Sequence, residues 1–132
     1  MITLYNVVSA DGYIARKDGS EDFIPNSYWP HTLNVLNGYD CIIVGRKTYD
    51  VIQNYEENMR KSFEDLPIKK IVITKDKSFH PKEGFEVAYA LEDVINPDLN
   101  IVVTSGPTLN NYLVENNFVD KNIYKRPLLE LV

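Results

Sequence analysis

Two short segments carry residue types that could bind a phosphate-bearing ligand. Gly45-Arg46-Lys47-Thr48 follows the apolar run 41–44, and Ser105-Gly106-Pro107-Thr108 follows the run 100–104. Both segments are typical of a strand that leads directly into a helix. Glycine there lets the backbone turn tightly and approach a ligand, and the free N–H groups of the new helix favour an anion. Because ligands of open α/β sheets bind at the carboxyl ends of the strands, the two segments should meet at one site. The alternative for either segment alone is a glycine turn followed by a helix cap.

A third segment adds a hydroxyl and an ammonium group. Thr74 ends the run 68–74 and Lys75 follows it, and such groups suit a ribose phosphate. A solvated loop is the alternative. The chain has neither the G-x-G-x-x-G pattern of dinucleotide-binding folds nor the phosphate loop of the Walker type, so the two commonest nucleotide-binding folds are excluded.

The elements that must position these residues alternate between strands and helices. Short apolar runs rich in β-branched residues predict strands at 2–8, 41–44, 68–74 and 100–104, with weaker candidates at 85–88 and 122–124. Runs without polar alternation are typical of strands buried on both faces of a parallel sheet. Helices are expected from Asn26 or Ser27 to about Asn37, from about Gly45, and after Gly106, with a short piece at 91–95. We therefore predict one α/β domain over residues 1–132, with a mostly parallel central sheet and helices on both faces.

Composition limits the function classes. The net charge of −5 disfavours nucleic acid as a partner, and no apolar stretch is long enough to cross a bilayer. No signal peptide is visible at the start of the chain, so a soluble, cytoplasmic protein is expected. Cys41 is the lone cysteine and can form neither an internal disulfide nor a zinc cluster. We expect it to be a core residue rather than a nucleophile, and we expect no metal site.

The sequence resembles the dihydrofolate reductase superfamily over nearly its whole length. Asp40 to Tyr49 is similar to the strand and "G-R-x-T" helix that bind the cofactor in this family, and Ser9 to Ala15 is similar to the "S-x-D-G-x-I-A" pattern of the riboflavin-pathway reductases. The segments 71–74 and 101–109 resemble the strands that face the adenosine ribose and the pyrophosphate. The family's usual Gly-Gly turn is Ser105-Gly106 here.

The resemblance implies hydride transfer from NADPH to a flat, nitrogen-rich heterocycle, with a pterin or a pyrimidine as substrate. Dihydrofolate reductases place an acid early in the first helix. The corresponding position here falls near Trp29, so Asp11 and Asp22 are the candidate catalytic carboxylates, with a turn aspartate as the alternative for Asp11. The implied cofactor-binding residues are Ala15, Gly45, Arg46, Lys47, Thr48, Thr74, Lys75, Ser105, Gly106, Pro107 and Thr108. The implied substrate-binding residues are Tyr5, Val7, Trp29 and Thr104.

Three functions remain open on the sequence. The first is a dihydrofolate reductase, the second is a riboflavin-pathway reductase of a phosphoribosylamino-pyrimidine, and the third is a nucleotide-binding protein without catalysis. Asp11-Gly12 and the missing helix acid favour the second, and Ser105 and the short C-terminus favour the third. Family members usually continue into a final strand pair, whereas this chain ends at Val132 with an apolar tail, 128–132. We expect that tail to pack as a strand, with a homodimer as the favoured arrangement.

Overall fold

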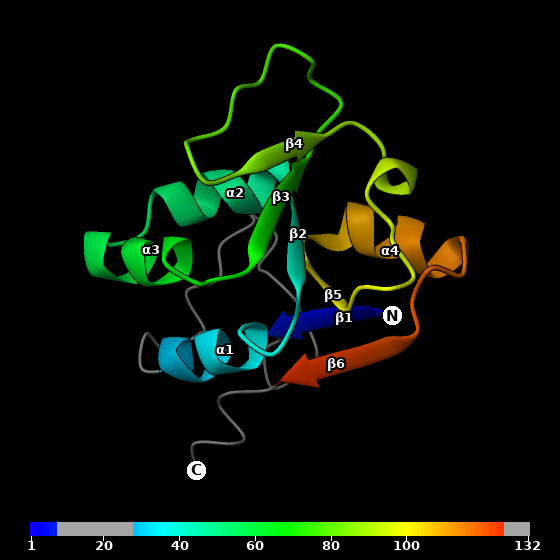
Figure 1. Ribbon diagram of the computed structural model, residues 1–132, viewed down its shortest axis with the longest axis horizontal. Coiled ribbons are helices and arrows are strands. Elements are labelled where there is room, and N and C mark those ends of the chain that lie inside the picture. The colour runs from blue at the N-terminus through cyan, green and yellow to red at the C-terminus, as the bar shows by residue number, and fades with distance from the viewer. Residues whose placement is uncertain (8–27, 126–132) are drawn as a thin grey trace.

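The strands form one sheet in which every pairing is parallel. The computed structural model describes residues 1–7 and 28–125. Within them, six strands lie in the order β4-β3-β2-β5-β1-β6 (Figure 1). Their bounds are β1 Ile2–Val7, β2 Cys41–Gly45, β3 Lys69–Ile73, β4 Glu86–Ala88, β5 Ile101–Thr104 and β6 Lys121–Lys125. All six strands were predicted from the apolar runs, and the parallel α/β class is confirmed. The tail 128–132 lies outside the described residues.

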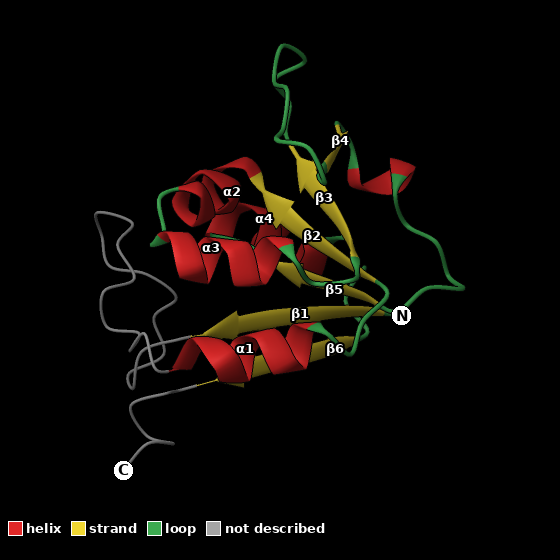
Figure 2. Cartoon of the chain, turned by 60° about the vertical axis from the view of Figure 1, so that its left-hand side comes forward, coloured by secondary structure: helices red, strands yellow, loops and turns green. Residues whose placement is uncertain are grey.

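Helices cover both faces of the sheet (Figure 2). One face carries α1 (Trp29–Leu36), α2 (Arg46–Gln53) and α3 (Glu57–Glu64), and we call it the α1 face. The other carries α4 (Pro107–Glu115) and the short 3-10 helix η2 (Leu91–Asp93), and we call it the α4 face. The strands separate the two cores by simple alternation, since Cys41 and Ile43 pack on the α4 face while Ile42 and Val44 pack on the α1 face.

Two helix predictions need correction. The N-cap of α1 is Tyr28 and makes no side-chain cap bond, so the expected cap at Asn26 or Ser27 was wrong. Packing decides this boundary, because the Trp29 indole docks on α3 and Pro30 fits the first turn. The helix α3 was not predicted at all. Its sequence is mostly polar, with Phe63 as its buried residue, and it gains support from i,i+4 ion pairs such as Glu57–Lys61.

The amino ends of the strands are held together by carboxylates. Asp40 Oδ2 accepts a hydrogen bond from Asn100 N at 2.8 Å, and Asp120 Oδ2 accepts one from Ile2 N at 2.8 Å. These carboxylates supply partners for backbone N–H groups at the amino edge of the sheet. The opposite, carboxyl edge is where the predicted site residues lie.

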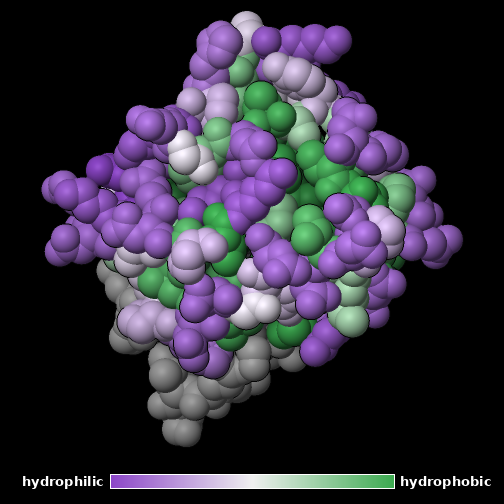
Figure 3. Space-filling view, in the orientation of Figure 1, coloured by the Kyte–Doolittle hydropathy of each residue, from purple (hydrophilic) through white to green (hydrophobic). Residues whose placement is uncertain are grey.

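The described surface carries many charged and polar groups. Hydrophilic side chains cover most of the view in Figure 3, with apolar side chains visible between them. Among the described residues, no helix is long and apolar enough to span a bilayer.

Candidate cofactor and substrate site

The two predicted strand-to-helix segments lie side by side. β2 and β5 are neighbours with Val44 paired to Thr104, so Gly45 and Ser105 are the next residues across the two strands. A Cβ atom placed on Gly45 would lie 3.8 Å from the Cβ of Ser105. The helices α2 and α4 therefore begin at adjacent points on the carboxyl edge of the sheet.

Both glycines are helix N-caps with ordinary backbone angles. Gly45 has φ −72° and ψ 162°, and Gly106 has φ −79° and ψ −177°. Any L residue adopts these conformations, so the expected need for glycine in a tight turn was wrong. What glycine contributes is space, because among the described residues a Cβ on Gly106 would meet no heavy atom within 4 Å beyond its chain neighbours. Within the described residues neither cap makes a side-chain hydrogen bond to its helix, so the first-turn N–H groups can bind a ligand, except at Pro107, which has no N–H.

Arg46 is already committed to neighbouring side chains. Its Nε lies 3.1 Å from Asp50 Oδ1, and its Nη1 lies 3.6 Å from Asp76 Oδ2. The guanidinium carbon also lies 4.0 Å from the centroid of the Phe79 ring. Arg46 therefore joins α2 to the loop 74–79, and the exposed Lys47 and half-buried Thr48 are the other polar side chains at the start of α2.

The loop after β3 places a hydroxyl and an ammonium group near this point. Thr74 is buried, and its Oγ1 accepts a hydrogen bond from Asp76 N at 3.1 Å. Lys75 is exposed. The Asp76 carboxylate accepts hydrogen bonds from the side chain and backbone of Ser78, and these bonds, with help from Arg46, lower its pKa. The loop therefore presents a fixed negative charge beside Lys75.

A row of residues that are small or carry an amide crosses the carboxyl edge on the α4 face. Gly45 and Ser105 belong to it, and the next residue across is Asn6 of β1, because the β1–β5 register pairs Leu4 with Val103. Ser105 Oγ donates a hydrogen bond of 2.8 Å to Asn110 Oδ1 of α4. Asn6 and Asn110 were missed by the sequence reasoning. The signal available was an asparagine inside an otherwise apolar strand.

Of the predicted substrate residues, Tyr5, Trp29 and Thr104 lie on the α1 face. Tyr5 and Thr104 are neighbours by the same register, and Tyr5 is 1% exposed within the core of that face. The indole Nε1 of Trp29 donates to Met59 O at 3.1 Å and to Ser62 Oγ at 3.0 Å. Its polar edge is therefore used to hold α1 against α3. Val7 ends β1 at the same edge of the sheet.

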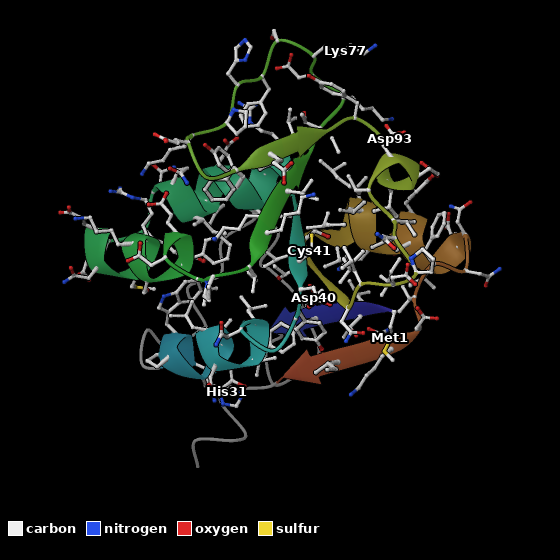
Figure 4. The ribbon with its side chains drawn as sticks, in the orientation of Figure 1. Met1, His31, Asp40, Cys41, Lys77 and Asp93 are labelled. Carbon is white, nitrogen blue, oxygen red and sulfur yellow. The ribbon has the colours of Figure 1, made fainter. Side chains whose placement is uncertain are left out.

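The structure does not place every predicted residue. Asp11, Ala15 and Asp22 lie outside the described residues. Pro107 starts α4, and Thr108 is exposed in its first turn. Cys41 is buried in the core of the α4 face, as predicted, where burial raises the pKa of its thiol to about 11 (Figure 4). In the described part of the chain, no group of His, Cys, Asp and Glu side chains could hold a metal ion.

Solved structures with the same fold were found by comparison. No protein-family model and no curated protein sequence matches the chain significantly. A diaminohydroxyphosphoribosylaminopyrimidine deaminase/5-amino-6-(5-phosphoribosylamino)uracil reductase from Thermotoga maritima is 15% identical, with a TM-score of 0.63 over 94% of this chain and 43% of that one. A putative riboflavin biosynthesis protein from Shewanella sp. PV-4 is 18% identical, with a TM-score of 0.65 over 93% of this chain and 74% of that one.

A dihydrofolate reductase gives a similar result. The enzyme from Enterococcus faecalis, complexed with NADP(H) and RAB-propyl, is 17% identical, with a TM-score of 0.62 over 88% of this chain and 65% of that one. The present chain thus spans less than half of the Thermotoga protein and about two thirds of the Enterococcus enzyme. The chain has the dihydrofolate reductase-like fold, in agreement with the resemblance in its sequence.

Proposed function

We propose that the protein is an NADPH-dependent reductase that transfers hydride to a flat, nitrogen-rich heterocycle. The observation that carries this proposal is the adjacency of Gly45 and Ser105, which brings the N-termini of α2 and α4 together at the carboxyl edge of the sheet. Such an arrangement suits a dinucleotide pyrophosphate. The solved proteins of this fold include reductases, and one of them holds NADP(H).

The residues present fit the cofactor. The backbone of 45–48 and 105–108 would hold the pyrophosphate, and the described residues leave room for it over Gly106. Thr74 and Lys75 would hold the ribose 2′-phosphate, with Lys47 adding positive charge. When bound, NADPH supplies the hydride. The protein's own part is to orient the two rings, to exclude water, and to supply a proton through Asp11 or Asp22.

Dihydrofolate is the substrate that we favour, and the riboflavin-pathway pyrimidine is the second candidate. One observation favours the pyrimidine. The place where dihydrofolate reductases carry an acid falls near Trp29, whose indole N–H is bound to α3 and so is not directed at a substrate. One structural neighbour is also named as a putative riboflavin biosynthesis protein, and another as a reductase of a phosphoribosylamino-uracil.

Cofactor binding is tested by titration calorimetry with NADPH and NADH. We expect NADPH to bind more tightly, and we expect Lys75→Ala to weaken NADPH binding by about tenfold to a hundredfold, the usual effect of losing one charged contact. Lys77→Ala is the matched control, because Lys77 is an exposed lysine of the same loop whose Nζ lies 6.0 Å from the Tyr89 ring centroid. Equal affinity for the two cofactors would contradict the role of Lys75.

The substrate is tested by NADPH oxidation, measured separately with dihydrofolate and with the phosphoribosylamino-pyrimidine. Turnover with one substrate alone identifies it. Tight NADPH binding without turnover of either would support the third function, a nucleotide-binding protein without catalysis.

A further inference from the structure

Three buried polar side chains form a cluster at the carboxyl edge of the sheet. Asn6 of β1, Ser105 after β5 and Asn110 of α4 are 2%, 6% and 6% exposed. We call these three residues the amide cluster. None of them is ionisable, and none belongs to the apolar packing that surrounds them.

The hydrogen bonds of the amide cluster are incomplete. Ser105 Oγ donates to Asn110 Oδ1, which satisfies both of these oxygens. The Nδ2 groups of Asn6 and Asn110 have no partner within the described residues. A buried amide without a partner is destabilising, and an apolar side chain of similar shape would avoid that penalty. Folding alone therefore gives no reason for the two unpaired Nδ2 groups.

The two unpaired groups lie on the same face of the sheet. Leu4 packs with Leu113 of α4 in the core of the α4 face, and Asn6 shares that face because it is two residues further along the strand. Continued two residues beyond its last pair, Leu4 with Val103, the β1–β5 register brings Asn6 beside Ser105, which is bonded to Asn110. The amide cluster therefore lies on the α4 face at the carboxyl edge of the sheet, where α4 begins.

We propose that the amide cluster binds an uncharged carbonyl oxygen of a ligand in the reductase site. This inference rests on the function proposed above. The cluster offers N–H donors without a positive charge, which suits a neutral acceptor, whereas burying a phosphate oxygen there without a cation would be costly. Two carbonyl groups fit this description, namely the carboxamide of the cofactor's nicotinamide and a ring carbonyl of the heterocyclic substrate.

The test uses Asn6→Leu in the full chain, which removes the unpaired amide and keeps a similar size. Asn6→Ala is the second variant in case leucine is too large. Thr3→Val is the matched control, because Thr3 is also a buried polar residue of β1 but lies toward the amino end of that strand. We expect Asn6→Leu to melt no lower than the wild type without ligand, and to lose about tenfold in affinity, as for one neutral hydrogen bond. Thr3→Val should leave every affinity unchanged.

The source of the carbonyl is separated by three ligands. Calorimetry with NADPH and with 2′-phospho-ADP-ribose, which lacks the nicotinamide, shows whether the loss of affinity in Asn6→Leu depends on the nicotinamide ring. The KM for the heterocycle shows whether the loss depends on the substrate. A loss confined to NADPH or to KM supports the inference and names the source. If the wild type binds NADPH and Asn6→Leu matches it with all three ligands, an ordered water fills the cluster and the inference fails while the reductase proposal stands. If the wild type does not bind NADPH, both fail.

Discussion

The buried thiol of Cys41 should make the stability of the fold depend on pH in the alkaline range. Desolvation in the core of the α4 face raises its pKa from 9.0 to about 11, and the nearby Lys69 opposes this only in part. The folded state therefore keeps a proton that the unfolded state releases. Because folding raises this pKa, the stability that the protonated thiol contributes is fully present below pH 9 and is lost as the pH rises toward 11. Each pKa unit corresponds to about 1.4 kcal/mol, so the expected loss is about 1.4 kcal/mol at pH 10 and approaches about 2.7 kcal/mol above pH 11.

Denaturant unfolding at several pH values from 8 to 11 measures this loss. Cys41→Val is the control, because valine suits a buried parallel strand and does not titrate. The difference in unfolding free energy between the two proteins isolates the thiol from lysines and tyrosines that titrate in the same range. If the wild type and Cys41→Val lose stability in parallel, the thiol is not desolvated as described. A second check is alkylation at pH 8, which should require unfolding.

Three further changes test the site. Gly45→Val should fold, as judged by circular dichroism, but should weaken cofactor binding at least about tenfold by crowding the pyrophosphate; normal binding would leave Gly45 a simple cap residue. Tyr49→Phe removes the hydroxyl that accepts a 3.0 Å bond from Lys82 N, and it should lower stability by about 1 kcal/mol and speed amide exchange in the loop 76–85; unchanged exchange would show that the bond does not hold the loop. Asp11→Asn should reduce turnover more than it reduces the melting temperature, and if Asp22→Asn has that effect instead, the proton role belongs to Asp22.

Much of the fold could be predicted because its strands are encoded locally. The interior positions of runs such as 41–44 and 100–104 are all apolar. This composition predicts strands that are buried on both faces, and therefore the parallel pairing that is observed. The helix α3 could not be recognised in the same way, because Phe63 is its buried residue and its stability comes from packing on α1. Local sequence favours a helix cap at Asn26 or Ser27, but the docked Trp29 sets the boundary.

The site could be predicted only where its residues are consecutive in the sequence. Gly45 and Ser105 stand out because each follows a strand and precedes a helix. The pairing of Arg46 with Asp76 depends on two segments that only the fold brings together, so the charge expected to face a phosphate turned out to be shared with carboxylates. Asn6 and Asn110 were missed for the same reason, because the surroundings of each amide depend on how β1, β5 and α4 pack together.

The position of β1 also affects the order in which the chain can fold. Ile2 pairs with Ile101, and Thr3 pairs with Lys121, so both partners of the first strand are made late. Until residues 101–125 have been synthesised, the apolar strand β1 has neither of the strands with which it pairs in the folded sheet. Contacts of such long sequence separation slow folding and leave strand edges exposed to other chains. We therefore expect nascent chains that end before β5 to aggregate or to need a chaperone, whereas the segment from β2 to β4 can begin to pair while synthesis continues.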